Sequence, residues 1–227
     1  MSVPYRDIFA AVSVRVNALV GPLAPALETS FITSPLTTAE FQSTIFPFTA
    51  IKYSVISAEE KLAGKIANNP DDPNRQFMAN TTAALTNPST LPSLSTNSKP
   101  IIGSWGAVRD SSNGTVCSQM PLDIVRRRAG STQVVPVYWF NVTSGRIEHT
   151  RPNVIIECCT YSRSDQLTVF NANGNILLSD ALEPEYVEGA LGLLMRDDEF
   201  MSQAQAYVAQ AQASSVGKSP AWVAPTV

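Results

Sequence analysis

The stretch Ser179–Arg196, SDALEPEYVEGALGLLMR, decides the fold class, because a helical pattern returns in it after a β-rich middle. Pro184 suits the first turn of a helix. Asp197 and Asp198 then stand where a further helix would be capped. We therefore expect two antiparallel helices, a helical hairpin within residues 164–213. The first of them carries five apolar side chains on one face: Tyr186, Val187, Ala190, Leu191 and Leu194.

The N-terminal part of the chain, residues 1–98, carries further helical patterns. Residues 4–20 place apolar side chains at spacings of three and four. A longer apolar face runs through residues 41–66 with Pro47 inside it, so this helix either kinks or begins at the proline. A third helix is expected near residues 73–86. These helices would join those at the C-terminal end in one bundle.

Residues 99–163 change character and indicate a β-rich insertion. A short helix is expected at 121–129, and hydrophobic β-branched runs bounded by Gly, Pro and Asn predict three strands: 132–142, 146–149 and 153–161. The predicted fold is therefore α+β and mainly helical. It consists of a helical bundle from the N- and C-terminal segments, a small antiparallel β insertion, and an extended C-terminal arm at 214–227.

Charge is unevenly spread along the chain. Residues 99–163 carry eight Lys and Arg against four Asp and Glu, whereas residues 164–227 carry two against eight. Opposite charges can attract within a subunit or between neighbours in an assembly. The run Arg126–Arg128 is too short for a nucleic-acid arm, and we expect it to form salt bridges rather than bind phosphate. The candidates for contacts between subunits are Arg126, Arg127, Arg128, Glu185, Glu188, Asp197 and Asp198.

The residue types that carry chemistry do not converge on a predicted reaction centre. His149 is the only histidine. As a base it would need Glu148 or Asp123 to orient it, and we interpret it as a strand residue beside a turn. Cys158 and Cys159 are adjacent, so in a strand they face opposite sides, which is poor geometry for a metal. We therefore expect no catalytic residue, no metal site and no cofactor.

Two features bear on the compartment. The first 20 residues carry charges, among them Arg6 and Asp7, that a secretory signal core would not tolerate. No stretch approaches the roughly 20 apolar residues of a membrane span. The three cysteines, with Cys117 as the third, are then expected to be free thiols in a reducing cytoplasm.

The tail contains Gly217-Lys218-Ser219, which resembles the end of a phosphate-binding loop. The first glycine of that pattern would have to stand at position 212, where the chain has Gln212. Pro220 follows at once, and the segment comes after a helix rather than a strand. This is not a phosphate-binding loop.

The tail is better interpreted as a docking arm. It has small residues, two prolines and one tryptophan, a composition typical of a segment that is extended on its own. A tryptophan flanked by prolines suits an anchor that orders when it enters a partner's groove. An idle terminus is the alternative. The candidate docking residues are Val216, Lys218, Pro220, Trp222, Val223, Pro225 and Val227.

Residues 100–215 resemble tailed-bacteriophage head-to-tail connector (adaptor) proteins. In that family a Leu/Ile-Pro-x-x-Tyr-x-x-Ala-Leu helix leads to an acidic turn and a second helix with an extended tail. The strand block NVIIECCTYSR, which begins at Asn153, resembles the small sheet that such proteins insert between helices. The matching helix and turn residues here are Leu182, Pro184, Tyr186, Ala190, Leu191, Asp197 and Asp198.

The resemblance implies a structural virion protein rather than an enzyme. Such adaptors form a ring, commonly dodecameric, beneath the portal and join the capsid to downstream neck or tail proteins. DNA passes through the lumen without sequence-specific binding, no membrane is involved, and the arm clasps the portal. The resemblance thus places the protein in the virion neck, assembled in the bacterial cytoplasm. Two alternatives stay open: another completion protein, such as a tail terminator or tail-tube connector, or an enzyme of unknown type.

Overall fold

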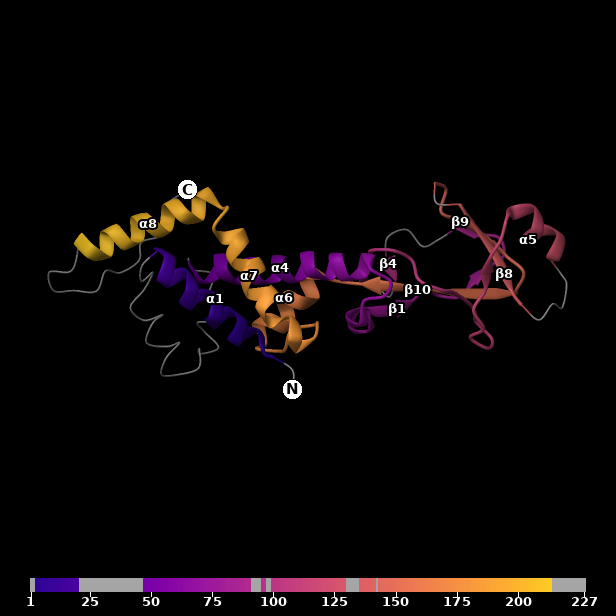
Figure 1. The fold of residues 1–227 in the computed structure, drawn as a ribbon, viewed down its shortest axis with the longest axis horizontal. Helices are drawn as coiled ribbons and strands as arrows, with labels where there is room; N and C mark the ends of the chain where they lie inside the picture. The colour runs from indigo at the N-terminus through magenta and orange to yellow at the C-terminus, as the bar shows by residue number, and fades with distance from the viewer. Residues whose placement is uncertain are drawn as a thin grey trace. The chain divides into compact units, whose positions relative to one another are not determined.

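The computed structural model describes residues 3–20, 47–90, 95–96, 99–129, 135–141 and 143–213 (Figure 1). This part of the chain is a mixed α+β protein, as the sequence predicts. The chain divides into two compact units. We call Met1–Leu62 with Arg163–Val227 the helical unit, and Ala63–Ser162 the β unit.

The helical unit takes its helices from both ends of the chain. They are α1 (Tyr5–Val20), α4 (Phe48–Asn68) as far as Leu62, α6 (Arg163–Asn171), α7 (Glu183–Leu194) and α8 (Asp198–Ala213), with a 3-10 turn η2 (Asp180–Leu182) before α7. α1 packs against α7 and α8. A Cβ at Gly189 of α7 would lie 3.1 Å from Ala58 Cβ of α4, so the absent side chain lets these two helices pack closely.

The helix α7 confirms the prediction made from its stretch of sequence. It begins at Glu183 with Pro184 in its first turn. The five apolar residues expected to share a face are the ones that α7 buries: Tyr186, Val187, Ala190, Leu191 and Leu194. A loop and the acidic residue Asp197 separate α7 from α8, so the predicted second helix is also present.

The position of Pro47 resolves the alternatives for the long apolar face. The helix α4 starts at Phe48, directly after the proline, and Ile51 N donates to the Pro47 carbonyl at 3.0 Å. Proline lacks an N–H group and is tolerated before or within the first turn, where no intrahelical donor is needed. The helix therefore begins at this point. Residues 41–46, which the sequence also assigned to this face, lie outside the described residues.

The prediction of a helix near residues 73–86 is wrong. A 3-10 turn, η1 (Pro73–Phe77), forms instead, with the Asp72 side chain accepting from Asn74 N at 2.8 Å. Two strands follow, β1 (Ala79–Thr81) and β2 (Leu85–Thr86). Their backbone groups pair with a long strand that is more than 60 residues away in the sequence, and this pairing outweighs the local helical pattern.

The β unit contains two sheets, both of which depend on strands in its C-terminal half. The larger sheet is centred on β10 (Asn153–Thr160), which pairs antiparallel with β1 and β2 and also with β5 (Lys99–Ile102) and β6 (Val108–Asp110). β4 (Ser95–Thr96) extends it beside β5. The smaller sheet has the order β3 (Ser89–Thr90), β9 (Arg146–His149), β8 (Val137–Asn141) and β7 (Ser118–Gln119).

One strand pair departs from the antiparallel arrangement that the sequence predicts. β7 and β8 are parallel, with Ser118 opposite Val137. Parallel neighbours need a crossover connection, and the short helix α5 (Leu122–Arg128) lies between these two strands in the sequence.

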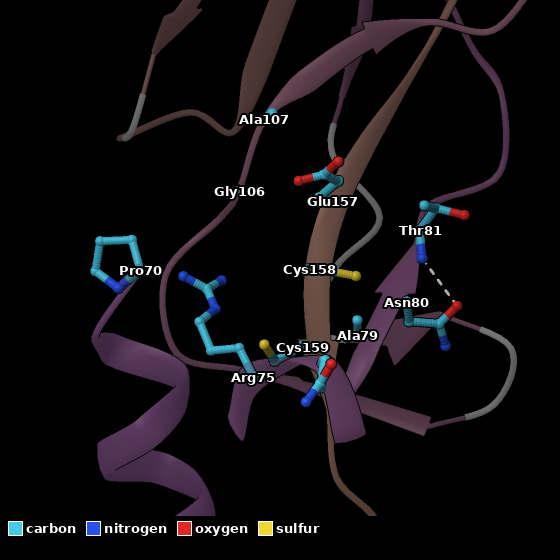
Figure 2. A pocket seen from close by; sticks show the side chains of 11 residues that line it. Pro70, Arg75, Ala79, Asn80, Thr81, Gly106, Ala107, Glu157, Cys158 and Cys159 are labelled. Carbon is cyan, nitrogen blue, oxygen red and sulfur yellow. Dashed lines mark hydrogen bonds between the residues drawn. The ribbon is translucent and has the colours of Figure 1, made fainter. Parts of the chain in front are cut away.

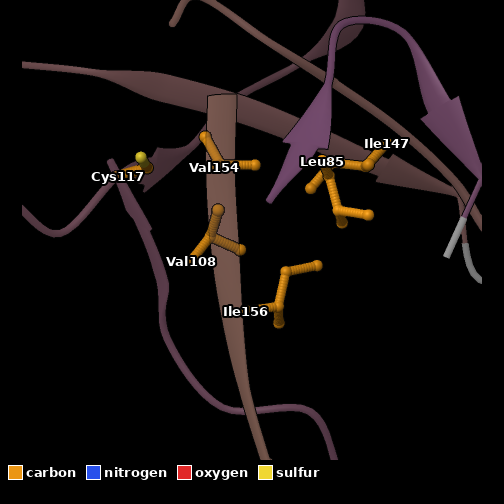
Figure 3. Packing of buried hydrophobic residues seen from close by; sticks show 6 residues of the cluster. All are labelled: Leu85, Val108, Cys117, Ile147, Val154 and Ile156. Atoms are coloured by element: carbon orange, nitrogen blue, oxygen red, sulfur yellow. The ribbon is translucent and has the colours of Figure 1, made fainter. Parts of the chain in front are cut away.

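The core of the β unit joins the two sheets (Figure 3). Ile147 of β9 and Val154 of β10 are fully buried in it, with partly buried aromatic rings packed around them. The buried cluster consists of Leu85, Val108, Cys117, Ile147, Val154 and Ile156. Burial of these apolar side chains is the main stabilising term available to the unit.

In the part of the chain that the structure describes, no helix is both long enough and apolar enough to span a membrane.

Candidate functional site

The helix α5 places its arginines beside a carboxylate of the smaller sheet. Val125 buries the inner face of the helix. Arg126 Nε donates to Glu148 Oε2 at 3.0 Å and its Nη2 to Oε1 at 2.8 Å, a bidentate pair. Arg146 Nη2 lies 2.9 Å from Glu148 Oε1 on the same carboxylate. The hydrogen bond from Arg126 holds the pKa of Glu148 below its usual range.

The remaining arginines of α5 are placed differently. Arg127 Nη2 lies 3.5 Å from Asp123 Oδ2, one helical turn earlier, and its side chain is 80% exposed. Arg128 is half-buried. The expected salt bridges are thus confirmed for Arg126 and Arg127. Contacts of the three arginines with another subunit remain a prediction. The Arg127 side chain, at 80%, is more exposed than that of Arg126, at 58%.

The acidic candidates lie on α7 and at the start of α8. Glu185 and Asp198 are exposed in the first turns of these helices, where the helix dipole favours negative charge. Glu188 pairs with Arg15 of α1. Asp197 caps α8, since its Oδ1 accepts from Phe200 N at 3.0 Å. Glu188 and Asp197 therefore have structural roles within the helical unit, and Asp198 and Glu185 face solvent.

The predicted docking arm lies outside the described residues. This holds for Val216, Lys218, Pro220, Trp222, Val223, Pro225 and Val227. Docking by these residues stays a prediction.

A buried polar network of the helical unit surrounds Glu59 of α4, which is fully buried. Its Oε2 accepts from Tyr5 Oη at 2.5 Å, and its Oε1 accepts from Tyr186 Oη at 2.7 Å and from Leu177 N at 3.0 Å. The Tyr5 hydroxyl also lies 3.1 Å from Gln166 Oε1. One carboxylate thus connects α1, α4 and α7 with the segment before η2. We interpret it as structural, because its acceptor positions are occupied by groups of the protein itself.

His149 is fully buried at the end of β9, as expected for a strand residue beside a turn. Its Nδ1 lies 2.8 Å from the Arg151 carbonyl, so Nδ1 carries the proton and donates. Its backbone N–H donates to Asn87 Oδ1 at 3.0 Å. Burial lowers the pKa of His149, and nearby carbonyl groups and Asp110 offset part of this effect. The ring is therefore neutral at pH 7, and its position is explained by its hydrogen bonds.

Acidification is expected to destabilise the β unit through His149. In the unfolded chain this imidazole binds a proton near pH 6.5, while burial keeps the folded ring neutral to lower pH. The unfolded state then gains the proton first, so the free energy of unfolding falls by up to about 1.4 kcal/mol per pH unit below 6.5. Urea unfolding at several pH values between 7 and 5 measures this slope.

The matched control for that slope is His149→Gln, which keeps a donor but does not titrate. The variant is expected to show a flatter pH dependence from 7 to 5. Hydrogen bonds from Ser112 and Arg126 lower the pKa of Asp110 and of Glu148 respectively, which moves the titration of both carboxyl groups further away from this window. Equal slopes for the two proteins between pH 7 and 5 would show that His149 is not the responsible group.

The three cysteines are buried free thiols. Burial raises the pKa of Cys117 to about 11 and also raises the pKa of Cys158. A thiol in this state has little thiolate at neutral pH and is a poor nucleophile. Cys158 and Cys159 lie on opposite sides of β10, as their adjacency predicts (Figure 2). Among the described residues, no group of three or more His, Cys, Asp or Glu is placed to hold a metal ion.

A pocket of about 670 Å³ opens on one face of the larger sheet (Figure 2). Ala79 stands opposite Cys159 and Thr81 opposite Glu157, so these four side chains project from the same face. Pro70 and the turn η1 form the wall. The pocket is assembled from segments as far apart as residues 70 and 159, and no local motif in the sequence indicates it.

The pocket contains a guanidinium group with spare donors. Arg75 Nη2 donates to the Ser104 carbonyl at 3.2 Å, and the side chain is half-buried. No carboxylate among the described residues forms an ion pair with Arg75. Glu157, in the same pocket, is already paired with Arg109. A guanidinium has five N–H donors, so Arg75 can still bind a carboxylate or another anion.

Two comparisons with known proteins, a scan against protein-family models and a search of curated proteins, give no match.

Proposed function

We propose that this protein is a head-to-tail adaptor of a tailed bacteriophage, a structural virion protein that forms a ring beneath the portal. In this role it joins the capsid to the tail and continues the DNA channel. The observation that carries the proposal is the layout of the chain. Helices from both ends form one compact unit, and the intervening residues 63–162 form a separate β unit. That layout is the one implied by the resemblance of residues 100–215.

The proposed architecture is a helical bundle with a β insertion and an extended C-terminal arm at residues 214–227. The bundle would pack side by side around the ring and the arm would reach the portal. In support, the pattern residues Tyr186, Ala190 and Leu191 are core residues of α7, and Asp197 caps the helix that follows. The resemblance therefore rests on residues that α7 buries and on the residue that caps α8.

The charge distribution supports contacts between copies. The helical unit contains seven Lys and Arg against 13 Asp and Glu, while the β unit contains nine against six. A ring is built from heterologous contacts, in which two different surfaces of neighbouring subunits meet. Units of opposite net charge provide such surfaces, and attraction between them would favour association at low salt.

Another neck or tail completion protein is the second candidate, because a ring-forming helical protein with a β insertion would suit that role also. Electron microscopy and native mass spectrometry of the purified protein, with and without portal, separate the two. The adaptor proposal expects rings, commonly of twelve subunits, that attach to portal. Rings of another symmetry that bind tail tube and ignore portal would favour the second candidate. A protein that stays monomeric with portal present would contradict both.

Deleting residues 214–227 is expected to abolish attachment to portal while leaving the protein folded. The described helices end at Ala213, and each of the apolar core residues identified above precedes that position. The deletion also removes Trp222, and tryptophan is one of the residue types enriched among the side chains that dominate binding energy at interfaces. Co-sedimentation with portal measures attachment, and thermal unfolding measures folding.

The control for this deletion is a full-length chain in which the order of residues 214–227 is scrambled. It keeps the length, charge and composition of the arm but loses its pattern, and it is expected to fail to attach as well. Undiminished attachment of the truncated chain would remove the arm from the proposal. If the scrambled chain attaches to portal and the truncated chain does not, attachment depends on the composition of the arm rather than on the order of its residues.

A further inference from the structure

The pocket lined by Arg75, which we call the Arg75 pocket, lies in the β unit and contains a positive charge that forms no ion pair with a carboxylate of the described residues. Arg75 donates one hydrogen bond to a backbone carbonyl and has no ion pair among the described residues. In the same turn η1, the Phe77 side chain is 44% exposed. The pocket therefore presents a cation, and the turn η1, two of whose residues line the pocket, exposes an aromatic ring.

The turn between α7 and α8 presents the complementary groups. Asp198 is exposed and, unlike Asp197 and Glu199, has no hydrogen bond among the described residues. Met195, three residues earlier, is 41% exposed. The carboxylate of Asp198 can pair with the guanidinium of Arg75, and the thioether of Met195 can contact the edge of an aromatic ring such as that of Phe77.

We propose that the Arg75 pocket receives Asp198 from a second copy of this chain, with Met195 of that copy against Phe77. The inference rests on the proposed function, because it names a contact by which adjacent subunits of the ring would join. It is heterologous: the β unit of one copy binds the helical unit of the next, and each copy offers both surfaces. The opposite net charges of the two units favour this contact over one between like units.

The test is a charge exchange in the full-length protein, read by the size distribution of the assembly. Arg75→Glu is expected to raise the protein concentration needed for assembly at least tenfold, since it sets two carboxylates against each other. Asp198→Arg is expected to do the same. The double variant, Arg75→Glu with Asp198→Arg, restores the pair and is expected to assemble within threefold of the wild-type concentration. Mass photometry over a dilution series measures all four proteins.

The matched control is Lys65→Glu, which makes the same change of charge at an exposed position outside the pocket. It is expected to shift assembly less than threefold. Circular dichroism and thermal unfolding confirm that each variant is folded. Where Arg75→Glu fails to fold, Arg75→Gln, paired with Lys65→Gln, replaces it and is expected to shift assembly at least threefold.

The outcomes separate this inference from the proposed function. Normal assembly of both single variants would overturn the inference while leaving the ring and its portal attachment intact. If each single variant impairs assembly and the double variant does not restore it, the proposed pairing of Arg75 with Asp198 is overturned. A change in monomer stability with unchanged assembly would place the contact within one chain and also overturn it. A wild-type protein that forms no ring, with or without portal, would overturn the proposed function together with the inference.

Discussion

Replacing Glu59 with alanine is expected to lower the free energy of unfolding by about 4 kcal/mol, because buried groups lose their acceptor. The hydroxyls of Tyr5 and Tyr186 and the N–H of Leu177 all donate to this carboxylate. Each of them, left unsatisfied in the core, costs about 1–3 kcal/mol, and partial rehydration or rearrangement recovers some of that cost. The truncation also leaves a cavity at a fully buried position.

The control for Glu59 is its neighbour Glu60, whose carboxylate pairs with Arg163 at the surface. Both side chains of that pair are more than 40% exposed, so Glu60→Ala is expected to cost less than about 1 kcal/mol. Chemical denaturation followed by circular dichroism measures both variants. If Glu59→Ala lowers the free energy of unfolding no more than Glu60→Ala does, the structural role of the buried carboxylate is contradicted.

Replacing Gly103 with alanine is expected to destabilise the β unit by about 3 kcal/mol or more. Gly103 has a φ of +68°, which costs a residue with a side chain roughly 1–2 kcal/mol. The added Cβ would also lie 2.5 Å from the backbone of Ala67, in the last turn of α4. Backbone atoms cannot rotate away as a flexible side chain can, so overpacking adds a further ~1–3 kcal/mol.

Gly114 provides the matched comparison for Gly103. Its φ is +72°, but a Cβ there would meet no atom within 4 Å. Gly114→Ala is therefore expected to cost only the backbone strain, about 1 kcal/mol. The difference between the two variants in urea unfolding isolates the steric contact with Ala67. If both substitutions lower the free energy of unfolding by the same amount, the backbone at Gly103 can move away from Ala67 without a loss of stability.

The sequence predicts those parts of the fold whose pattern of apolar or turn residues lies within a single helix or strand. The buried face of α7 repeats at helical spacing, and Pro47 left only a kink or a helix start, of which the structure shows the start. The strand β10 contains an apolar run bounded by turns. Residues 79–86 were assigned to a helix because nothing nearby shows that their partner is β10. Strand pairing over such a distance leaves no local trace.

The candidate site is less predictable, because partners of charged groups depend on tertiary structure. The run Arg126–Arg128 is visible as a charge cluster, but its sequence does not reveal that Arg126 is bound to Glu148. Arg75 and Glu59 carry no motif at all. One lies in a pocket made from three segments, and the other interrupts an apolar helical face. Both roles become apparent only once distant elements are in place.

The central position of β10 has a consequence for biosynthesis. β1 and β2 both pair with it, yet they leave the ribosome long before it does. The 79 residues from Thr82 to Thr160 take about 4 to 16 s to translate at ~5–20 residues per second. During that interval the nascent chain exposes strand segments that have no partner, and a chaperone that shields residues 79–110 would raise the yield of native protein.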